Sequence, residues 1–267
     1  MSVTMSGPGS AAGAAPRVAA RGAALGRLTR TEFRLFLRER IGPIWGVGFP
    51  LVLLIIFGSI PSFSRAQASL GGLTELDLYV PILIAFVIAM LALNALPPVL
   101  AGYREKGILR RLQTTPVGPV RVLAAQLVID VAVVAVMLVL VLAVARIGYG
   151  VALPRQLAGF VFAALLAAAA LLAIGLFVAA AAPTARAANA IGAILFFPMM
   201  FFAGLWLPIA QMPSVLRHIS HATPLGAAVQ ALQDSAQGHW PHPLQLVTLA
   251  LYALAFGLAA ARLFRWE

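Results

Sequence analysis

Long runs of hydrophobic residues, without period-2 alternation, make up most of the chain. The six runs cover about residues 44–60, 78–101, 122–145, 156–182, 188–207 and 244–261. Each is near the ~20 residues that an α-helix needs to cross a hydrocarbon core about 30 Å thick. Runs of this length are typical of membrane helices and not of the strands of a membrane β-barrel. The pattern therefore predicts an all-α integral membrane protein with about six transmembrane helices.

Two different segments precede the first run. Residues 1–24 are rich in Ala, Gly, Ser and Pro and contain no apolar run, which predicts a disordered tail and no signal peptide. At about 100° per residue, a helix over residues 25–40 would carry four arginines on one side: Arg27, Arg30, Arg34 and Arg38. Phenylalanines on the opposite side favour a basic amphipathic helix on the membrane surface over a merely solvated charged helix.

The composition supports lipid as the main solvent of this protein. Its 267 residues are 62% hydrophobic and only 10% charged, whereas soluble domains are about half apolar and about one quarter charged. Too few polar side chains remain to cover a surface that faces water. We therefore expect residues 25–267 to form one transmembrane domain with no soluble globular domain.

The net charge of +11 indicates orientation more than partners. Cytoplasmic segments of membrane proteins carry an excess of Lys and Arg. If the N-terminus is cytoplasmic, 15 of the 19 Lys and Arg residues fall on cytoplasmic segments. This asymmetry predicts that both termini are cytoplasmic in a multi-pass protein of the plasma membrane. It also makes nucleic acid an unnecessary partner.

Few polar residues occur within the predicted spans. Asp130 is the one acid clearly inside a run, and an intramembrane acid is a candidate functional residue. The alternative, which we favour, is a partly hydrated acid near the inner interface, bonded to Gln126 or to an arginine of a neighbouring helix. Asn94 and Asn189 are expected to form hydrogen bonds between helices.

Metal and nucleotide chemistry have weak support in the sequence. The four histidines, His218, His221, His239 and His242, fall in one predicted external stretch, and the chain has no cysteine. With one acid nearby, ordinary loop histidines are favoured over a metal site. Residues 102–107 have the glycine spacing that opens a P-loop, but the Lys and Ser/Thr that must follow are absent. If the chain takes part in an energy-consuming process, the energy must therefore come from a partner protein or from an ion gradient.

The predicted cytoplasmic loop after the second run contains a short amphipathic segment. Residues 103–113 read YREKGILRRLQ, in which Leu109 and Leu112 can share one apolar strip while the arginines lie mostly off it. A following proline, Pro116, ends the helix. The pattern alone leaves two destinations open, which are lipid headgroups and a groove on another protein.

The arrangement resembles the permease subunits of type-2 ATP-binding-cassette exporters, which include daunorubicin-resistance and polysaccharide-export permeases. The basic helix at residues 25–40 is similar to the family's elbow helix. Residues 105–116 resemble the family's charged pair, Gly, Leu and Pro pattern, except that Ile108 stands where Thr is common. Residues 198–224 are similar to the family's fifth span and the re-entrant external helices before the sixth.

The resemblance implies roles for two groups of residues. The loop helix would be a coupling helix that contacts a separate ATPase through Arg104, Glu105, Lys106, Gly107, Leu109, Arg110, Arg111 and Leu112. The proline-rich stretch would form half-helices of an external gate at Gly204, Pro208, Pro213 and Pro224. Non-helical backbone at membrane depth is tolerated only where protein or water satisfies it, and a plain surface loop is the alternative for this stretch.

The implied assembly is a permease homodimer in the bilayer with two copies of an ATP-binding-cassette ATPase. ATP and Mg would bind the ATPase, and this chain would be a transport subunit with no cofactor and no metal of its own. Its cargo would be an amphipathic or hydrophobic drug, antibiotic or lipid-like molecule moved outward, a function typical of multidrug or antibiotic resistance. The alternative from the residues is an ion-gradient-coupled carrier that uses Asp130. A membrane enzyme that acts on lipids is the least favoured class.

Overall fold

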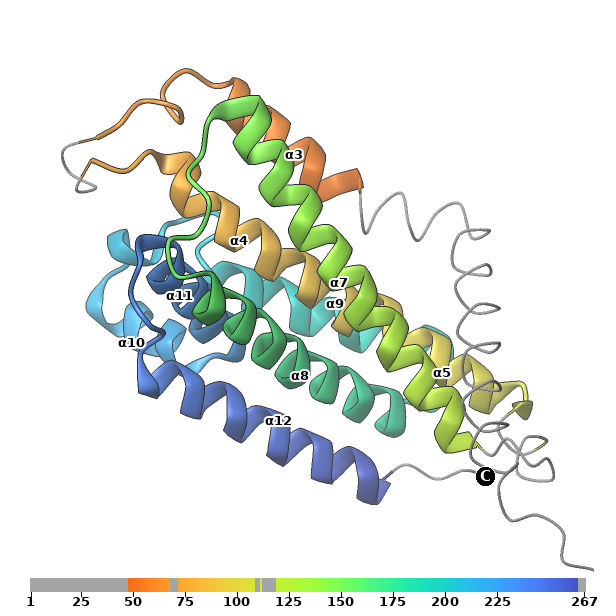
Figure 1. Cartoon of the computed structure of the whole chain (residues 1–267). Helices are drawn as coiled ribbons and strands as arrows, with labels where there is room; N and C mark the ends of the chain where they lie inside the picture. The colour runs from red at the N-terminus through yellow and green to blue at the C-terminus, as the bar shows by residue number, and fades with distance from the viewer. Residues whose placement is uncertain (1–47, 68–71, 109–110, 112–118, 264–267) are drawn as a thin grey trace, which may run out of the picture.

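The computed structural model describes residues 48–67, 72–108, 111 and 119–263, and these residues are almost entirely helical (Figure 1). The elements are α3 (Phe49–Ser59), α4 (Glu75–Met90), η3 (Leu91–Ala95), α5 (Leu96–Glu105), α7 (Pro119–Tyr149), α8 (Leu157–Ala181), α9 (Ala185–Phe202), η4 (Ile209–Gln211), α10 (Ser214–Ala222), α11 (Pro224–Gln237) and α12 (Pro243–Leu263). No β-strand occurs within the described ranges; one isolated bridge joins Ala66 to Thr74. The predicted tail and amphipathic helix, at residues 1–24 and 25–40, lie outside the described residues.

Five of the described helices are long and apolar enough to cross a membrane. They are the continuous helix Glu75–Glu105, formed by α4, η3 and α5, together with α7, α8, α9 and α12. A sixth apolar helix, α3, has 11 described residues. Within the described residues, each of the six apolar runs overlaps one of these helices. The prediction of an all-α integral membrane fold is confirmed, and the chain is a multi-pass membrane protein.

The fifth run illustrates how hydropathy and backbone differ. Apolar residues continue to Leu207, but α9 ends at Phe202. Gly204 has φ of +89°, a left-handed conformation that glycine adopts without steric cost. The chain therefore leaves the helix before the apolar run is over.

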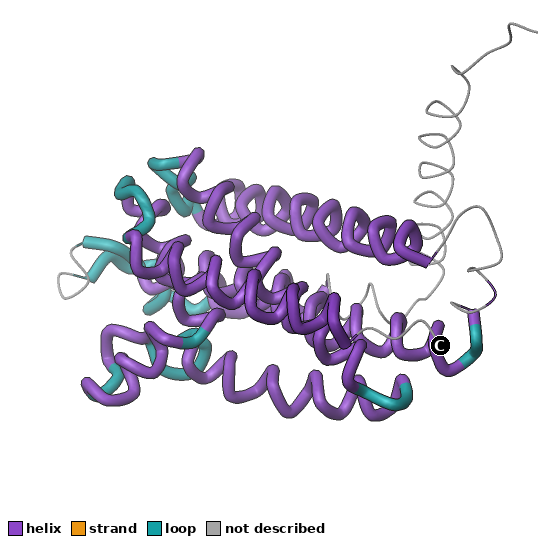
Figure 2. The backbone as a smooth tube through the Cα atoms, turned by 90° about the horizontal axis from the view of Figure 1, so that it is seen from below, coloured by secondary structure: helices purple, strands orange, loops and turns teal. Residues whose placement is uncertain are grey.

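The helix Glu75–Glu105 forms the centre of the bundle. In its most apolar window 83% of residues are buried within the chain, against 11% in α12 and 22% in α9. The central helix thus packs against protein on nearly all sides, while α9 and α12 leave most of their apolar surface for lipid or another subunit. Figure 2 shows the helices running roughly parallel between two ends of the bundle.

The two ends differ in their elements (Figure 1). One, which we call the Glu105 end, contains the end of α5, the turn between α8 and α9, and the last residues of α12. The other, which we call the α10 end, contains α10, α11, the start of α4 and the loop between α7 and α8. Candidate functional residues occur at both ends.

A π-helical turn, η3, interrupts the central helix halfway along. The N–H of Leu96 donates to the carbonyl of Leu91, five residues earlier. The carbonyl of Leu93 has no helical donor at all, because Pro97 and Pro98 occupy the positions four and five residues ahead. This widened turn carries the neighbouring helices very close to the backbone.

Two glycines make that close approach possible. A Cβ atom added to Gly192 of α9 would lie 1.9 Å from the carbonyl oxygen of Leu93. A Cβ added to Gly175 of α8 would lie 2.0 Å from the carbonyl oxygen of Ala92. Small residues are the usual device by which membrane helices bring their backbones together, and here they seat α8 and α9 directly on the π-turn.

Candidate functional site

At the Glu105 end, two charged side chains join α5 to the turn between α8 and α9. The guanidinium of Arg104 donates hydrogen bonds to the carbonyl oxygens of Ala180, at 3.0 Å, and Ala182. The carboxylate of Glu105 accepts a hydrogen bond of 3.0 Å from the backbone N–H of Ala185. We call this pair of side chains and their three backbone partners the Arg104–Glu105 clasp.

The signs of the two charges fit the helix ends that they contact. The last carbonyls of a helix and the first N–H groups of the next have no partners within their own helices. Partial negative charge at the end of α8 favours Arg104, and partial positive charge at the start of α9 favours Glu105. The clasp therefore fastens both helices to the residue at which the predicted coupling segment begins.

The other predicted coupling residues divide into two groups. Lys106 directly follows α5 and has an exposed side chain, and Gly107 comes next with φ of +66°. Arg111 is exposed, and its backbone N–H donates to the carbonyl of Gly107 at 3.2 Å. The predicted residues Leu109, Arg110 and Leu112 lie outside the described residues. Lys106 and Arg111 thus present exposed positive charge beside the clasp.

The predicted intramembrane polar residues occupy three different environments. Asp130 of α7 is 2% exposed, and Oδ1 accepts a hydrogen bond of 3.1 Å from Nε2 of Gln126 on the same helix. Its Oδ2 has no partner among the described residues. The buried Nδ2 of Asn94, in η3, likewise has no partner there, and Asn189 is exposed on α9. No hydrogen bond between helices involves these side chains within the described part of the chain.

At the α10 end, the predicted gate residues shape a pair of short helices. Gly204 follows α9, Pro208 and Pro213 directly precede η4 and α10, and Pro224 is the first residue of α11. Proline fits these positions because the first N–H groups of a helix have no helical acceptor. The three prolines thus mark helix starts in a folded cap, and Gly204 lies just after the end of α9.

The cap is fastened to the spans by buried contacts. Oγ of the fully buried Ser220 donates a hydrogen bond of 2.6 Å to the carbonyl of Phe202, at the end of α9. Apolar residues of α11, among them Leu225 and Leu232, are fully buried, and α11 packs against α4, α8 and α12. The second helix of the cap therefore inserts into the bundle.

The histidines of this end are distributed over separate contacts. Nδ1 of His218 lies 2.7 Å from the carbonyl oxygen of Ser214, and Nδ1 of His242 accepts a hydrogen bond of 3.3 Å from the N–H of Leu244. Burial, together with the charges of His218 and Arg217, lowers the pKa of His221 below its usual value. His221 therefore holds a proton less readily than a free histidine does.

Sequence reasoning missed the partners of the clasp. Arg104 and Glu105 lie between 76 and 80 residues from the backbone groups that they contact. The only local signal is the start of α9, where Oγ1 of Thr184 accepts a hydrogen bond from the N–H of Ala187. That N-cap predicts a helix start, but it does not indicate which distant carboxylate lies beside it.

Comparison with known proteins gives one result. The sequence matches the family model described as ABC-2 type transporter over residues 23–237. The match covers most of the chain, from the predicted amphipathic segment to the end of α11. Among curated proteins, none matches the sequence.

Proposed function

Because the chain belongs to the ABC-2 type transporter family, and is thus a permease subunit of an ABC transporter, we propose that it works as an exporter. Two copies would form the pathway, and two copies of a separate ATPase would bind and hydrolyse ATP with Mg. The cargo would be an amphipathic or hydrophobic molecule moved outward across the plasma membrane. In this arrangement the Glu105 end and both termini are cytoplasmic, and the α10 end is external.

The observation that carries this proposal is the Arg104–Glu105 clasp. The proposed ATPase contact begins directly after it, at Lys106 and Gly107, and includes the exposed Arg111. A push on this segment would act on α5 and, through the clasp, on the ends of α8 and α9. In the proposal Arg104 and Glu105 thus lie at the start of the predicted ATPase contact, and their bonds to the turn between α8 and α9 also make them positioning residues.

The π-turn gives the central helix two halves on which such a push can act. An ATPase can shift a permease between two states only through contacts that differ between those states. The proposed contact is at one end of the helix Glu75–Glu105, and α11 packs on α4 near the other. The cap formed by α10 and α11 would then open or close the external mouth of the pathway as α4 moves.

Apolar surface on the outer helices supports a second subunit and a lipid environment. On α9, Ile194 and Phe197 are 70% and 61% exposed. Exposed apolar side chains of this size must be covered by lipid or by protein. We propose that a second copy of the chain covers part of this surface and that the bilayer covers the rest.

The test is to purify the tagged chain from its native membranes in a gentle detergent and to identify what accompanies it by mass spectrometry. We expect a stoichiometric ATPase with Walker motifs, and we expect the double variant Leu109→Asp, Leu112→Asp to lose it while remaining in the membrane. Leu153→Asp is the matched control, because Leu153 is 55% exposed in the loop at the opposite end. This control should retain the ATPase.

Two results would contradict parts of the proposal. An ATPase that stays bound to the double variant would overturn the assignment of the coupling segment. Failure to recover any ATPase, under conditions that preserve known complexes, would favour the ion-gradient-coupled carrier. The structural feature in favour of that alternative is the buried carboxylate of Asp130, with one oxygen unpartnered among the described residues.

A further inference from the structure

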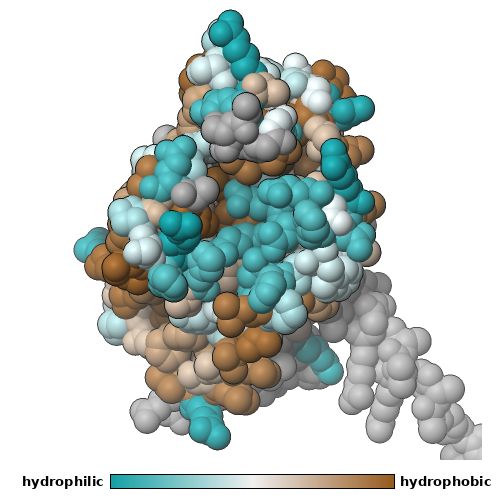
Figure 3. All heavy atoms as spheres, turned by 90° about the vertical axis from the view of Figure 1, so that its left-hand side faces the viewer, coloured by the Kyte–Doolittle hydropathy of each residue, from teal (hydrophilic) through white to brown (hydrophobic). Residues whose placement is uncertain are grey.

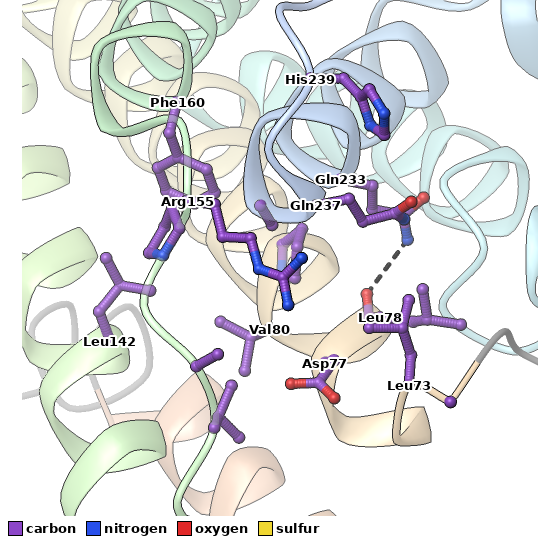
Figure 4. A pocket seen from close by; sticks show the side chains of 16 residues that line it. Leu73, Asp77, Leu78, Val80, Leu142, Arg155, Phe160, Gln233, Gln237 and His239 are labelled. Carbon is purple, nitrogen blue, oxygen red and sulfur yellow. Dashed lines mark hydrogen bonds between the residues drawn. The ribbon is translucent and has the colours of Figure 1, made fainter. Parts of the chain in front are cut away.

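A cavity of about 480 Å³ opens at the α10 end, between the start of α4, the loop before α8 and the end of α11 (Figure 4). The α10 end faces the viewer in Figure 3, where hydrophilic side chains gather over the centre and apolar ones lie around the flanks. The volume is within the range of small-molecule sites, about 300 to 1,000 Å³. None of the residues singled out by the sequence analysis for gating or coupling lines this cavity.

Apolar side chains form one part of the cavity wall. Val80 of α4, Leu142 of α7 and Phe160 of α8 are each less than 10% exposed and line it together. They come from three helices near their ends at the bundle surface. A ligand that fills the cavity would therefore place apolar atoms against this wall.

Two polar side chains of the cavity, Asp77 and Gln233, already have partners. Oδ2 of Asp77 accepts hydrogen bonds from the N–H and the hydroxyl of Thr74, at 2.9 and 2.7 Å. Asp77 also lies in the first turn of α4, where the helix dipole offsets its negative charge. Nε2 of Gln233 donates to the carbonyl of Leu78 at 3.2 Å, the dashed line in Figure 4.

Arg155 differs from these groups. Its guanidinium points into the cavity above Asp77 and Val80 (Figure 4) and has no hydrogen-bond or ion-pair partner among the described residues. The guanidinium of Arg155 is therefore a positive group with its donors unpaired among the described residues, and the carboxylate of Asp77 lies below it in the same cavity (Figure 4). A planar guanidinium binds phosphate and carboxylate groups through paired hydrogen bonds.

The fold holds the backbone of Arg155 in place. The N–H of Arg155 donates to the carbonyl of Ala236 at 3.3 Å, and the N–H of Gln156 donates to the carbonyl of Ser235 at 3.0 Å. The stem of Arg155 lies against Gly238, where an added Cβ would be 3.3 Å from Cβ of Arg155. These contacts fasten the loop before α8 to the end of α11 and direct Arg155 into the cavity.

We propose that this cavity binds a single-chain amphiphile with an anionic head, a phosphate or a carboxylate. The head contacts Arg155, and the first apolar atoms of the tail contact Val80, Leu142 and Phe160. The proposal rests on the proposed function in one respect, that the amphiphile is exported cargo at the external end. Binding itself needs no ATPase, so it can be tested separately.

The experiment measures binding of dodecyl phosphate to the purified full chain in dodecyl maltoside by isothermal titration calorimetry. We expect one site per chain, a loss of affinity of at least about tenfold in Arg155→Gln, and a smaller loss in Arg155→Lys, which keeps the charge but not the fork. The matched control is Arg65→Gln, since Arg65 is an exposed arginine of the same end that does not line the cavity. This control should bind as the unaltered chain does.

Four results would overturn the proposal or part of it. Unchanged affinity in both Arg155→Gln and Arg155→Lys would show that Arg155 is not part of the site. An equal loss of affinity in Arg65→Gln would show that binding depends on the net positive charge of the chain and not on the position of Arg155. Inorganic phosphate binding as tightly as dodecyl phosphate would exclude a role for the apolar wall. Tighter binding of phosphatidic acid would identify a resident lipid of the outer leaflet and overturn the assignment as cargo. Loss of the ATPase contact in the pull-down would leave the binding result intact.

Discussion

Gly175 and Gly192 let α8 and α9 contact the backbone of the π-turn more closely than any larger residue would allow. In Gly192→Ala the new methyl would meet the carbonyl oxygen of Leu93, a backbone atom that cannot rotate away. Overpacking of this kind costs roughly 1–3 kcal/mol. We expect a lower thermal unfolding midpoint for purified Gly192→Ala in detergent.

Gly257 of α12 provides the control at the same scale. A Cβ added there would meet nothing within 4 Å, and alanine is the better helix former by about 1 kcal/mol. Gly257→Ala should therefore unfold at the same temperature as the unaltered chain or slightly above it. Equal thermal unfolding midpoints for Gly192→Ala and Gly257→Ala would show that the backbone of η3 shifts to make room for the extra methyl group.

At the scale of elements, the Arg104–Glu105 clasp joins α5 to the consecutive helices α8 and α9, which contact it 76 to 80 residues further along the chain. Glu105→Ala removes the acceptor of the Ala185 N–H, whereas Glu105→Gln keeps an oxygen in the same place without the charge. If the clasp transmits motion, Glu105→Ala should lower transport several-fold while ATP hydrolysis by the assembled complex stays nearly unchanged. The transport rate of Glu105→Gln should lie between that of Glu105→Ala and that of the unaltered chain.

The measurement is the ratio of transport to ATP hydrolysis in proteoliposomes that contain the complex. A clasp with only a structural role would lower both activities together, through loss of folded protein. An unchanged ratio in Glu105→Ala would therefore contradict the transmitting role. Recovery in Glu105→Gln would show that the hydrogen bond matters more than the charge.

At the scale of the whole molecule, the distribution of charge predicts which end is cytoplasmic. The chain contains no cysteine, so single cysteines can report each side. Ser214 and Arg186 are exposed at opposite ends of the bundle. A membrane-impermeant maleimide should label Ser214→Cys in intact cells and Arg186→Cys only after permeabilisation. The reverse pattern would contradict the proposed orientation, because 15 of the 19 Lys and Arg residues would then face outward.

The sequence by itself determined the class of fold and the approximate place of each span. Lipid cannot hydrogen-bond to backbone groups, so an apolar run of sufficient length must form a helix there. Local chemistry also determined several helix starts, such as the reciprocal hydrogen bonds of Thr74 and Asp77 at the start of α4. It could not give the end of α9, because hydropathy continues past Phe202 while the backbone turns at Gly204.

Only the tertiary structure decided which distant groups meet. The sequence placed Arg104 and Glu105 in a surface that contacts a partner, and the structure shows both side chains bonded to the turn between α8 and α9. In the sequence, Arg155 likewise cannot be distinguished from the other Lys and Arg residues, which number 19 in all. The physical reason is the same in both cases. A hydrogen bond or a cavity depends on relative positions of several helices, and these follow from packing over the whole chain, whereas helix formation in lipid depends on each segment alone.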